Sequence, residues 1–185
     1  MGYDEKEEDV GFFTVDDTGD GQYDWNADLY KEKQIVFAAD LEAMSNYELW
    51  ERKGKFSEHD YDITNKGDDE SIGSALIIPG IPVLGCVELK CRNVLSTTFP
   101  TTVVDTEKMN KLLSRTTFSK LPVFICWRFT DTDMYYQVDY KHKFTITQSR
   151  NTHCSKDNKW EYKQVSHIPM DLLQQCHPLM FGKEG

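Results

Sequence analysis

Glu88 and Lys90 are the two side chains whose types and spacing point most directly to chemistry. They lie in residues 83–92, VLGCVELKCR, a run that is apolar and contains β-branched residues. Side chains at i and i+2 of a strand leave the same face, so this carboxylate and ammonium point together while Val87 and Leu89 point the other way into a core. Such a pair is half of a site for metal-dependent phosphodiester cleavage. The other half is a second acid from an adjacent strand.

The acid-x-Lys pattern by itself is weak, and only its context singles out Glu88. It recurs along the chain, for example as Glu51–Lys53, Glu88–Lys90, Asp139–Lys141, Asp157–Lys159 and Glu161–Lys163. Four of the pairs lie at a helix end, in a polar loop or in polar alternating strands, where they are most simply solvated. Glu88 alone follows a run apolar enough for a central strand, where an unpaired charge would be costly. An ordinary same-face charge pair remains the alternative interpretation.

The composition is that of a folded domain with an acidic extension. The 185 residues are 39% hydrophobic, which is enough for one core. The net charge of −10 is uneven: residues 1–26 hold nine acids and one lysine, and the remainder is nearly balanced. We therefore expect an acidic N-terminal segment over residues 1–26, with a hairpin over residues 10–25, and a single α/β domain over residues 27–185.

Apolar runs and cysteines indicate the compartment. No run approaches the roughly 20 residues of a membrane helix, and the acidic start does not resemble a signal peptide. The cysteine count is five, and Cys86, Cys91 and Cys126 lie in apolar strands, where a reduced thiol acts as a small hydrophobe. We expect no membrane association and a cytoplasmic location, in the host cytoplasm if the protein is viral.

Periodicity predicts a mixed central sheet flanked by helices, an α/β fold. A long amphipathic helix over residues 28–52 would bury Ile35, Val36 and Ala39. The further elements expected are strands over 55–64, 75–81, 83–92, 122–129, 134–140, 144–148 and 159–165, and helices over 104–114 and 171–175.

The element order and the motif VELK around Glu88 resemble the PD-(D/E)XK nuclease superfamily, with the restriction endonuclease-like fold of many restriction enzymes, Holliday-junction resolvases and phage recombination nucleases. The resemblance covers about residues 28–140. In that family an acid on one strand and an acid-x-Lys on the next hold the metal. Glu88 and Lys90 match the second element. Within HDYDI, Asp62 is the better match to the first acid because an apolar residue follows it, and Asp60 competes; no proline precedes either.

The resemblance implies an active site and its partners. Asp62, Glu88 and the Leu89 carbonyl would hold Mg²⁺ or Mn²⁺, and Asp62, Glu88 and Lys90 would be catalytic. DNA is the implied partner, and a homodimer is one arrangement to test. The basic residues implied to contact the DNA backbone are Arg92, Lys108, Lys111 and Arg115.

Two functions remain open at this stage. The first is a metal-dependent deoxyribonuclease acting on DNA ends, junctions or recombination intermediates, of the kind that phages and other mobile elements encode. The second is a non-catalytic binding protein on the same fold, whose acidic N-terminus engages a basic partner. Convergence of Asp62, Glu88 and Lys90 favours the enzyme, whereas a salt-bridged Lys90 without an open cleft favours the binding protein. A weaker alternative is zinc held among His153, Cys154, His167, Cys176 and His177.

Overall fold

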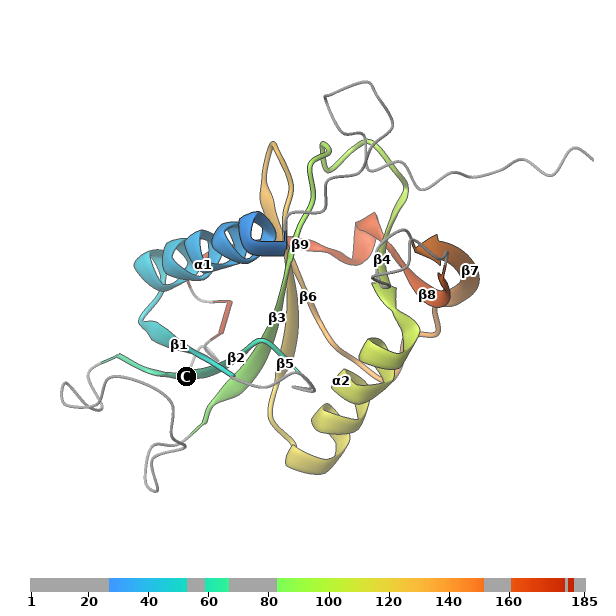
Figure 1. The fold of residues 1–185 in the computed structure, drawn as a ribbon. Helices are drawn as coiled ribbons and strands as arrows, with labels where there is room; N and C mark the ends of the chain where they lie inside the picture. The colour runs from blue at the N-terminus through green and yellow to red at the C-terminus, as the bar shows by residue number, and fades with distance from the viewer. Residues whose placement is uncertain (1–26, 53–58, 67–82, 152–160, 179, 182–185) are drawn as a thin grey trace, which may run out of the picture.

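A computed structural model describes residues 27–52, 59–66, 83–151, 161–178 and 180–181 (Figure 1). The expected N-terminal hairpin, the expected strand over 75–81 and the first part of the strand over 55–64 lie outside these residues. Neither helix of the described part combines the length and apolar character needed to cross a membrane.

The described part of the chain contains two α-helices, nine strands and one 3₁₀ turn. In chain order they are α1 (Ala27–Met44), β1 (Tyr47–Glu51), β2 (Tyr61–Asn65), β3 (Gly85–Cys91), β4 (Thr101–Asp105), α2 (Thr106–Ser119), β5 (Val123–Arg128), β6 (Asp133–Gln137), β7 (Thr145–Asn151), β8 (Glu161–Pro169), a 3₁₀ turn (Met170–Leu172) and β9 (Gln174–Gln175).

A six-stranded mixed sheet in the order β1-β2-β3-β5-β6-β9 forms the centre of the fold. β3 and β5 run parallel, with Glu88 beside Ile125, and the other pairs are antiparallel. A separate antiparallel sheet has the order β4-β8-β7. In Figure 1 α1 lies on one side of the central sheet and α2 on the other. The expected mixed α/β fold with helices flanking the sheet is confirmed at this level.

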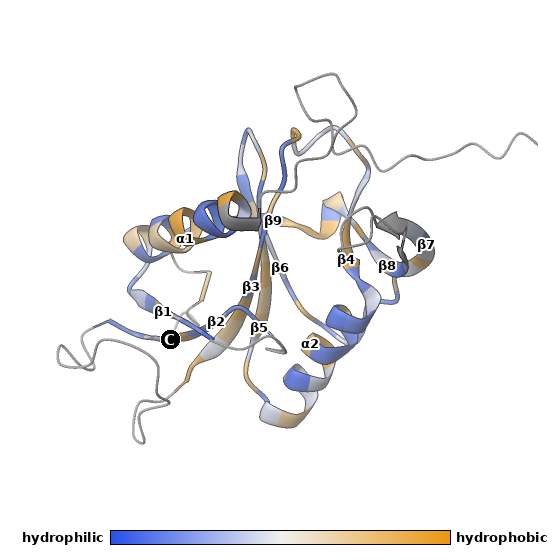
Figure 2. Ribbon diagram, in the orientation of Figure 1, coloured by the Kyte–Doolittle hydropathy of each residue, from blue (hydrophilic) through white to orange (hydrophobic). Residues whose placement is uncertain are grey.

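Strand β3 is covered on both faces, and this decides the environment of Glu88. Val87 and Leu89 pack with Phe37 of α1 in one core, as the alternation predicted. On the opposite face Cys86 packs in a second core that includes Leu112 of α2. Orange apolar segments therefore mark β3 and β5 in Figure 2. The side chains from Cys86 to Leu89 are therefore removed from water on both faces of the strand.

Gly85 lets β3 begin close to the chain that enters β5. A Cβ at this position would lie 2.9 Å from the Pro122 carbonyl oxygen and 3.2 Å from Ile63 Cδ1. The same carbonyl accepts a hydrogen bond from Cys86 N at 3.0 Å. The absence of a side chain at residue 85 therefore allows the parallel pairing that positions the rest of β3.

The predicted helix over residues 28–52 is wrong in its second half and in its buried face. α1 ends at Met44, and the chain turns into β1, which pairs with β2. Glu42 supports this end, since its Oε1 accepts a hydrogen bond from Leu49 N at 2.6 Å. Ile35 and Val36 are each 51% exposed. The buried residues of α1 are instead Phe37, Ala38 and Leu41. Pairing with β2 overrides the local helical pattern.

Two further elements differ from expectation. Residues 101–105 form β4, paired with β8, so the helix expected over 104–114 begins instead at Thr106. Pairing with β8 and burial of Val104 in the core with Leu112 supply the reason. The expected helix near residues 171–175 is a 3₁₀ turn over Met170–Leu172 followed by β9.

Candidate functional site

Glu88 lies at the centre of a buried charge cluster. Its side chain is fully enclosed, with Lys90 Nζ 2.5 Å from Oε1 and Lys108 Nζ 2.9 Å from Oε2. Lys90 comes from the same strand, so the predicted common direction of these two side chains is confirmed. We call Asp60, Glu88, Lys90 and Lys108 the carboxylate–lysine cluster.

Lys108 reaches the cluster because of the way α2 begins. Asp105 caps the helix, and its Oδ1 accepts hydrogen bonds from Glu107 N at 2.9 Å and Lys108 N at 3.1 Å. An acidic cap satisfies backbone donors that the first turn cannot use internally. The cap fixes the turn that carries Lys108, so this lysine pairs with Glu88, whereas the resemblance implied that it contacts DNA.

The two lysines keep Glu88 ionised. Burial by itself would raise the pKa of Glu88, but the charges of Lys90 and Lys108 outweigh it and hold the pKa below its ordinary value. Burial would lower the pKa of Lys90, and the charge of Glu88 raises it instead. Oε2 of Glu88 lies 2.9 Å from Lys108 Nζ, and both the charge and the hydrogen bond of this lysine help to lower the pKa of Glu88.

Asp60 is the acid that lies opposite Glu88. The register pairs Tyr61 with Val87, so one further step along the strands brings Asp60 to Glu88. Oδ2 of Asp60 accepts a hydrogen bond from Leu89 N at 2.8 Å. Burial raises the pKa of Asp60, the charge of Glu88 adds to this rise, and Lys90 opposes it. Two adjacent carboxyls therefore have pKa values that are shifted in opposite directions.

Gln34 of α1 reaches the same point from the opposite side. Its Nε2 donates to the Leu89 carbonyl at 2.7 Å and lies 3.4 Å from Asp60 Oδ2. An amide donor therefore faces both oxygens. An open pocket of about 230 Å³, lined in part by Gln34, Arg52 and Asp60, lies next to this contact.

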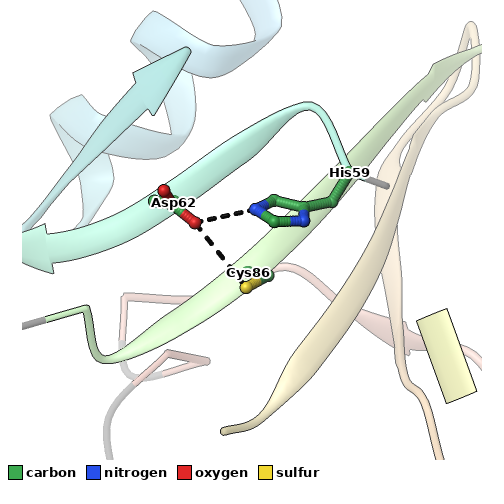
Figure 3. Close-up of side chains that lie close together, drawn as sticks. All are labelled: His59, Asp62 and Cys86. Carbon is green, nitrogen blue, oxygen red and sulfur yellow. Dashed lines mark hydrogen bonds and ion pairs between the residues drawn. The ribbon is translucent and has the colours of Figure 1, made fainter. Parts of the chain in front are cut away.

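Asp62 has different partners, of which Figure 3 shows His59 and Cys86. Its Oδ1 lies 2.7 Å from His59 Nε2 and 3.7 Å from Cys86 Sγ, and its Oδ2 lies 3.2 Å from Arg52 Nε. The register places it beside Cys86, two residues before Glu88 along β3. The structure thus brings Asp60 to Glu88 and Lys90, and it brings Asp62, the first acid expected from the sequence, to a separate group.

His59 and Asp62 form a buried ion pair. Burial would lower the pKa of His59, but the hydrogen bond to Asp62 and the nearby Cys86 raise it to about 9. Burial would raise the pKa of Asp62, and its hydrogen bond to His59, with the charges of His59 and Arg52, lowers it. Both groups are charged at neutral pH.

The other basic residues expected at DNA do not converge on Glu88. Arg92 is half-buried and donates to the Val103 carbonyl at 3.0 Å, which ties β3 to β4. Lys111 Nζ pairs with Glu107 Oε1 at 2.7 Å on the exposed side of α2. The charge of Arg115 helps to lower the pKa of Asp62.

The expected zinc alternative is only partly described. His153 and Cys154 lie outside the described residues. His167 instead contacts two threonines, at 3.1 Å from Thr101 Oγ1 and 2.8 Å from Thr147 Oγ1. The structure therefore gives His167 a polar role between β4, β7 and β8.

Sequence reasoning missed His59 and Gln34 as site residues. His59 had a usable signal, since it directly precedes the two competing aspartates in HDYDI. Gln34 had no such signal in the sequence, because its hydrogen bond to the Leu89 carbonyl depends on the packing of α1 on β3 and joins residues 55 positions apart.

No protein-family model matches this chain, and no curated protein or solved structure matches it at a significant level. The geometry of the described residues therefore carries the functional argument.

Proposed function

We propose that this protein is a metal-dependent nuclease that hydrolyses phosphodiester bonds in DNA, with its site at Asp60, Glu88 and Lys90. The observation that carries the proposal is the meeting of two acids, a lysine and the Leu89 carbonyl beside an open pocket. The mixed sheet between two helices is compatible with the restriction endonuclease-like core that the resemblance implies. Asp60 replaces Asp62 as the preferred first acid.

The donors fit a hard divalent ion. The Asp60 carboxylate, Glu88 Oε2 and the Leu89 carbonyl supply oxygens only, the ligands that Mg²⁺ and Mn²⁺ prefer. The Gln34 amide already places a donor between two of these oxygens, which shows that they face a common point. An ion held there would polarise a phosphodiester and lower the pKa of a bound water.

Lysine side chains prepare the proposed ion site for the negative charge of a phosphate. Lys90 and Lys108 hold Glu88 ionised in a site with little water, where electrostatic interactions are strong. Lys90 retains a 21% exposed side chain, so its ammonium can also offset the negative charge that develops on a phosphate. The hydrogen bond from Leu89 N restrains the Asp60 carboxylate, and pairing with β5 holds the strand that carries Glu88 and Lys90.

A non-catalytic binding protein is the second candidate, and one observation favours it. Both oxygens of Glu88 already face an ammonium group. The four members of the carboxylate–lysine cluster sum to zero charge when ionised, and such a buried network is stable without an ion. In that function the acidic segment over residues 1–26 would engage a basic partner.

The test compares cleavage by the parent and by Glu88→Gln under single-turnover conditions. Labelled duplex, single-stranded and branched DNA are incubated with Mg²⁺ or Mn²⁺, with EDTA as the metal-free reference. We expect metal-dependent cleavage by the parent and a loss of about a hundredfold or more in the variant. Glu107→Gln, an exposed acid on α2, is the matched control and should retain the parent rate. A folded parent that cleaves none of these substrates supports the binding protein.

A further inference from the structure

His59, Asp62 and Cys86 place three different donor atoms in one buried enclosure (Figure 3). Nε2 of His59, Oδ1 of Asp62 and Sγ of Cys86 all lie within 4.8 Å of one another. The three residues are 1%, 6% and 0% exposed. They come from the turn before β2, from β2 and from β3, so the group joins two neighbouring strands.

We propose that these three residues form a zinc site, separate from the oxygen donors around Glu88 and independent of the proposed nuclease activity. Imidazole, carboxylate and thiolate are the usual ligands of Zn²⁺, with bonds of about 2.0–2.3 Å. Tetrahedral bonds of that length place ligand atoms about 3.3–3.6 Å apart. The Asp62–Cys86 separation of 3.7 Å lies just above this range. The His59–Asp62 separation of 2.7 Å has to open by roughly half an ångström, which a side-chain rotation provides.

Arg52 prepares Asp62 for this role. Its Nε lies 3.2 Å from Oδ2, which leaves Oδ1 directed at His59 and Cys86. A hydrogen-bonded second oxygen is the usual support of a ligating carboxylate. Arg52 also lines the open pocket, so one side of this support reaches solvent.

The charge of the enclosure is compatible with the ion. The Asp62 carboxylate and the Cys86 thiolate would together balance the two positive charges of Zn²⁺, and the protons displaced from the ligands would leave to solvent. Cys86 is available because it is a free thiol.

The thiol selects the type of ion. Thiolate favours Zn²⁺ over Mg²⁺, whereas the oxygens of Asp60, Glu88 and Leu89 favour the harder ions. Two adjacent sites would therefore take different metals. Because the zinc site would tie the turn before β2 to β3, bound Zn²⁺ should stabilise the strand pairing that presents Asp60 to Glu88.

The experiment measures Zn²⁺ and Co²⁺ binding to the full chain after removal of metal. We expect one tight Zn²⁺ per chain, a higher melting temperature with Zn²⁺, and a Co²⁺–thiolate charge-transfer band. Cys86→Ser and His59→Gln should each weaken Zn²⁺ binding about a hundredfold and lose the melting shift. Cys126→Ser, in a fully buried cysteine of β5, and Glu88→Gln should bind as the parent does.

X-ray absorption of the zinc-loaded parent identifies the ligand atoms directly, so the test does not depend on whether the variants fold. We expect one sulfur ligand with nitrogen and oxygen ligands, and the sulfur should persist in single serine variants of the other four cysteines. The proposal is overturned by a parent that binds no Zn²⁺, by a zinc shell without sulfur, or by a folded Cys86→Ser variant with the parent's affinity.

Discussion

Asp60 and Asp62 show how two acids that stand two residues apart in the chain acquire different chemistry. Asp62 lies in β2, and Asp60 lies in the turn that leads into this strand. Asp60 meets Glu88 and the Leu89 amide, and burial next to another carboxyl raises its pKa. Asp62 meets His59 and Arg52, which lower its pKa despite burial. The facing residues of β3 decide this difference.

The two aspartates should separate activity from stability. Asp60→Asn should reduce metal-dependent cleavage about a hundredfold or more, because it removes an oxygen charge at the proposed ion site. Asp62→Asn should keep cleavage within tenfold but lower the free energy of unfolding by about 2–3 kcal/mol, because His59 and Arg52 lose their buried partner. Single-turnover cleavage and urea unfolding of both variants check this. A folded Asp62→Asn variant without cleavage would return the first ligand to Asp62.

The His59–Asp62 pair predicts a pH dependence of stability in metal-free protein. The pKa of His59 rises from 6.5 to about 9 on folding, so its contribution is complete below pH 6.5 and is lost as the pH rises through 9. The pKa of Asp62 falls on folding, so its contribution is present above 3.8 and is lost below it. The groups around His59 are Asp62, Cys86 and, through Asp62, Arg52 and Arg115.

Urea unfolding from pH 5 to pH 9.5 in EDTA measures this effect. The free-energy difference between the parent and His59→Gln should be largest near pH 6 and should shrink toward pH 9.5. A difference that stays constant across the range would show that folding leaves the pKa of this histidine unchanged.

At the scale of elements, the starts of β3 and α2 position the charged side chains. β3 begins at Gly85, where the Pro122 carbonyl approaches closely. α2 begins at the Asp105 cap, which orients the turn carrying Lys108. Substitutions at Gly85 and at Asp105 therefore test the two elements while residue 88 remains a glutamate.

Gly85→Ala should lower the free energy of unfolding by about 1–3 kcal/mol. The new methyl group would lie 2.9 Å from a backbone oxygen, and the β3–β5 pair would have to separate to relieve the contact. Chemical denaturation measures the loss. A variant as stable as the parent would show that residues 85 and 122 move apart freely.

Asp105→Ala should lower the free energy of unfolding by about 1 kcal/mol, because two backbone donors of α2 lose their acceptor. Asp105→Asn retains an oxygen at the same position and is the control, with stability close to that of the parent. If α2 also positions Lys108, cleavage by the alanine variant should fall as well. Equal stability of the two variants would argue against the cap.

At the scale of the whole molecule, the acidic charge is concentrated at one end of the sequence. Residues 1–26 carry nine acids and one lysine of a chain whose net charge is −10. A nearly balanced remainder can approach DNA more easily than the total charge suggests.

Deleting residues 1–9 should strengthen DNA binding at low salt. The deletion removes five acids and one lysine, and exposed charges act over about 10 Å at 0.1 M salt. Binding measured by fluorescence anisotropy should converge with that of the parent at high salt, and the melting temperature should change little because the segment has few apolar groups. Weaker binding after the deletion would show that the segment itself contacts the nucleic acid.

The local pattern of the sequence determined the central strand, the mixed α/β class and the common direction of Glu88 and Lys90. These follow from the two-residue period of a strand and from the apolar run around it, which act within a few residues. Burial of Val87 and Leu89 on the other face follows from the same alternation and is confirmed.

Tertiary structure alone decided which acid meets Glu88, where α1 ends and what Lys108 contacts. Register between β2 and β3 joins residues about 25 positions apart, and a shift along the strand exchanges Asp60 for Asp62 without altering any local pattern. Residues 47–51 continue a helical pattern but gain more from pairing with β2. Lys108 meets Glu88 only because α2 packs on the face of β3 opposite α1, and no spacing along the chain encodes that contact.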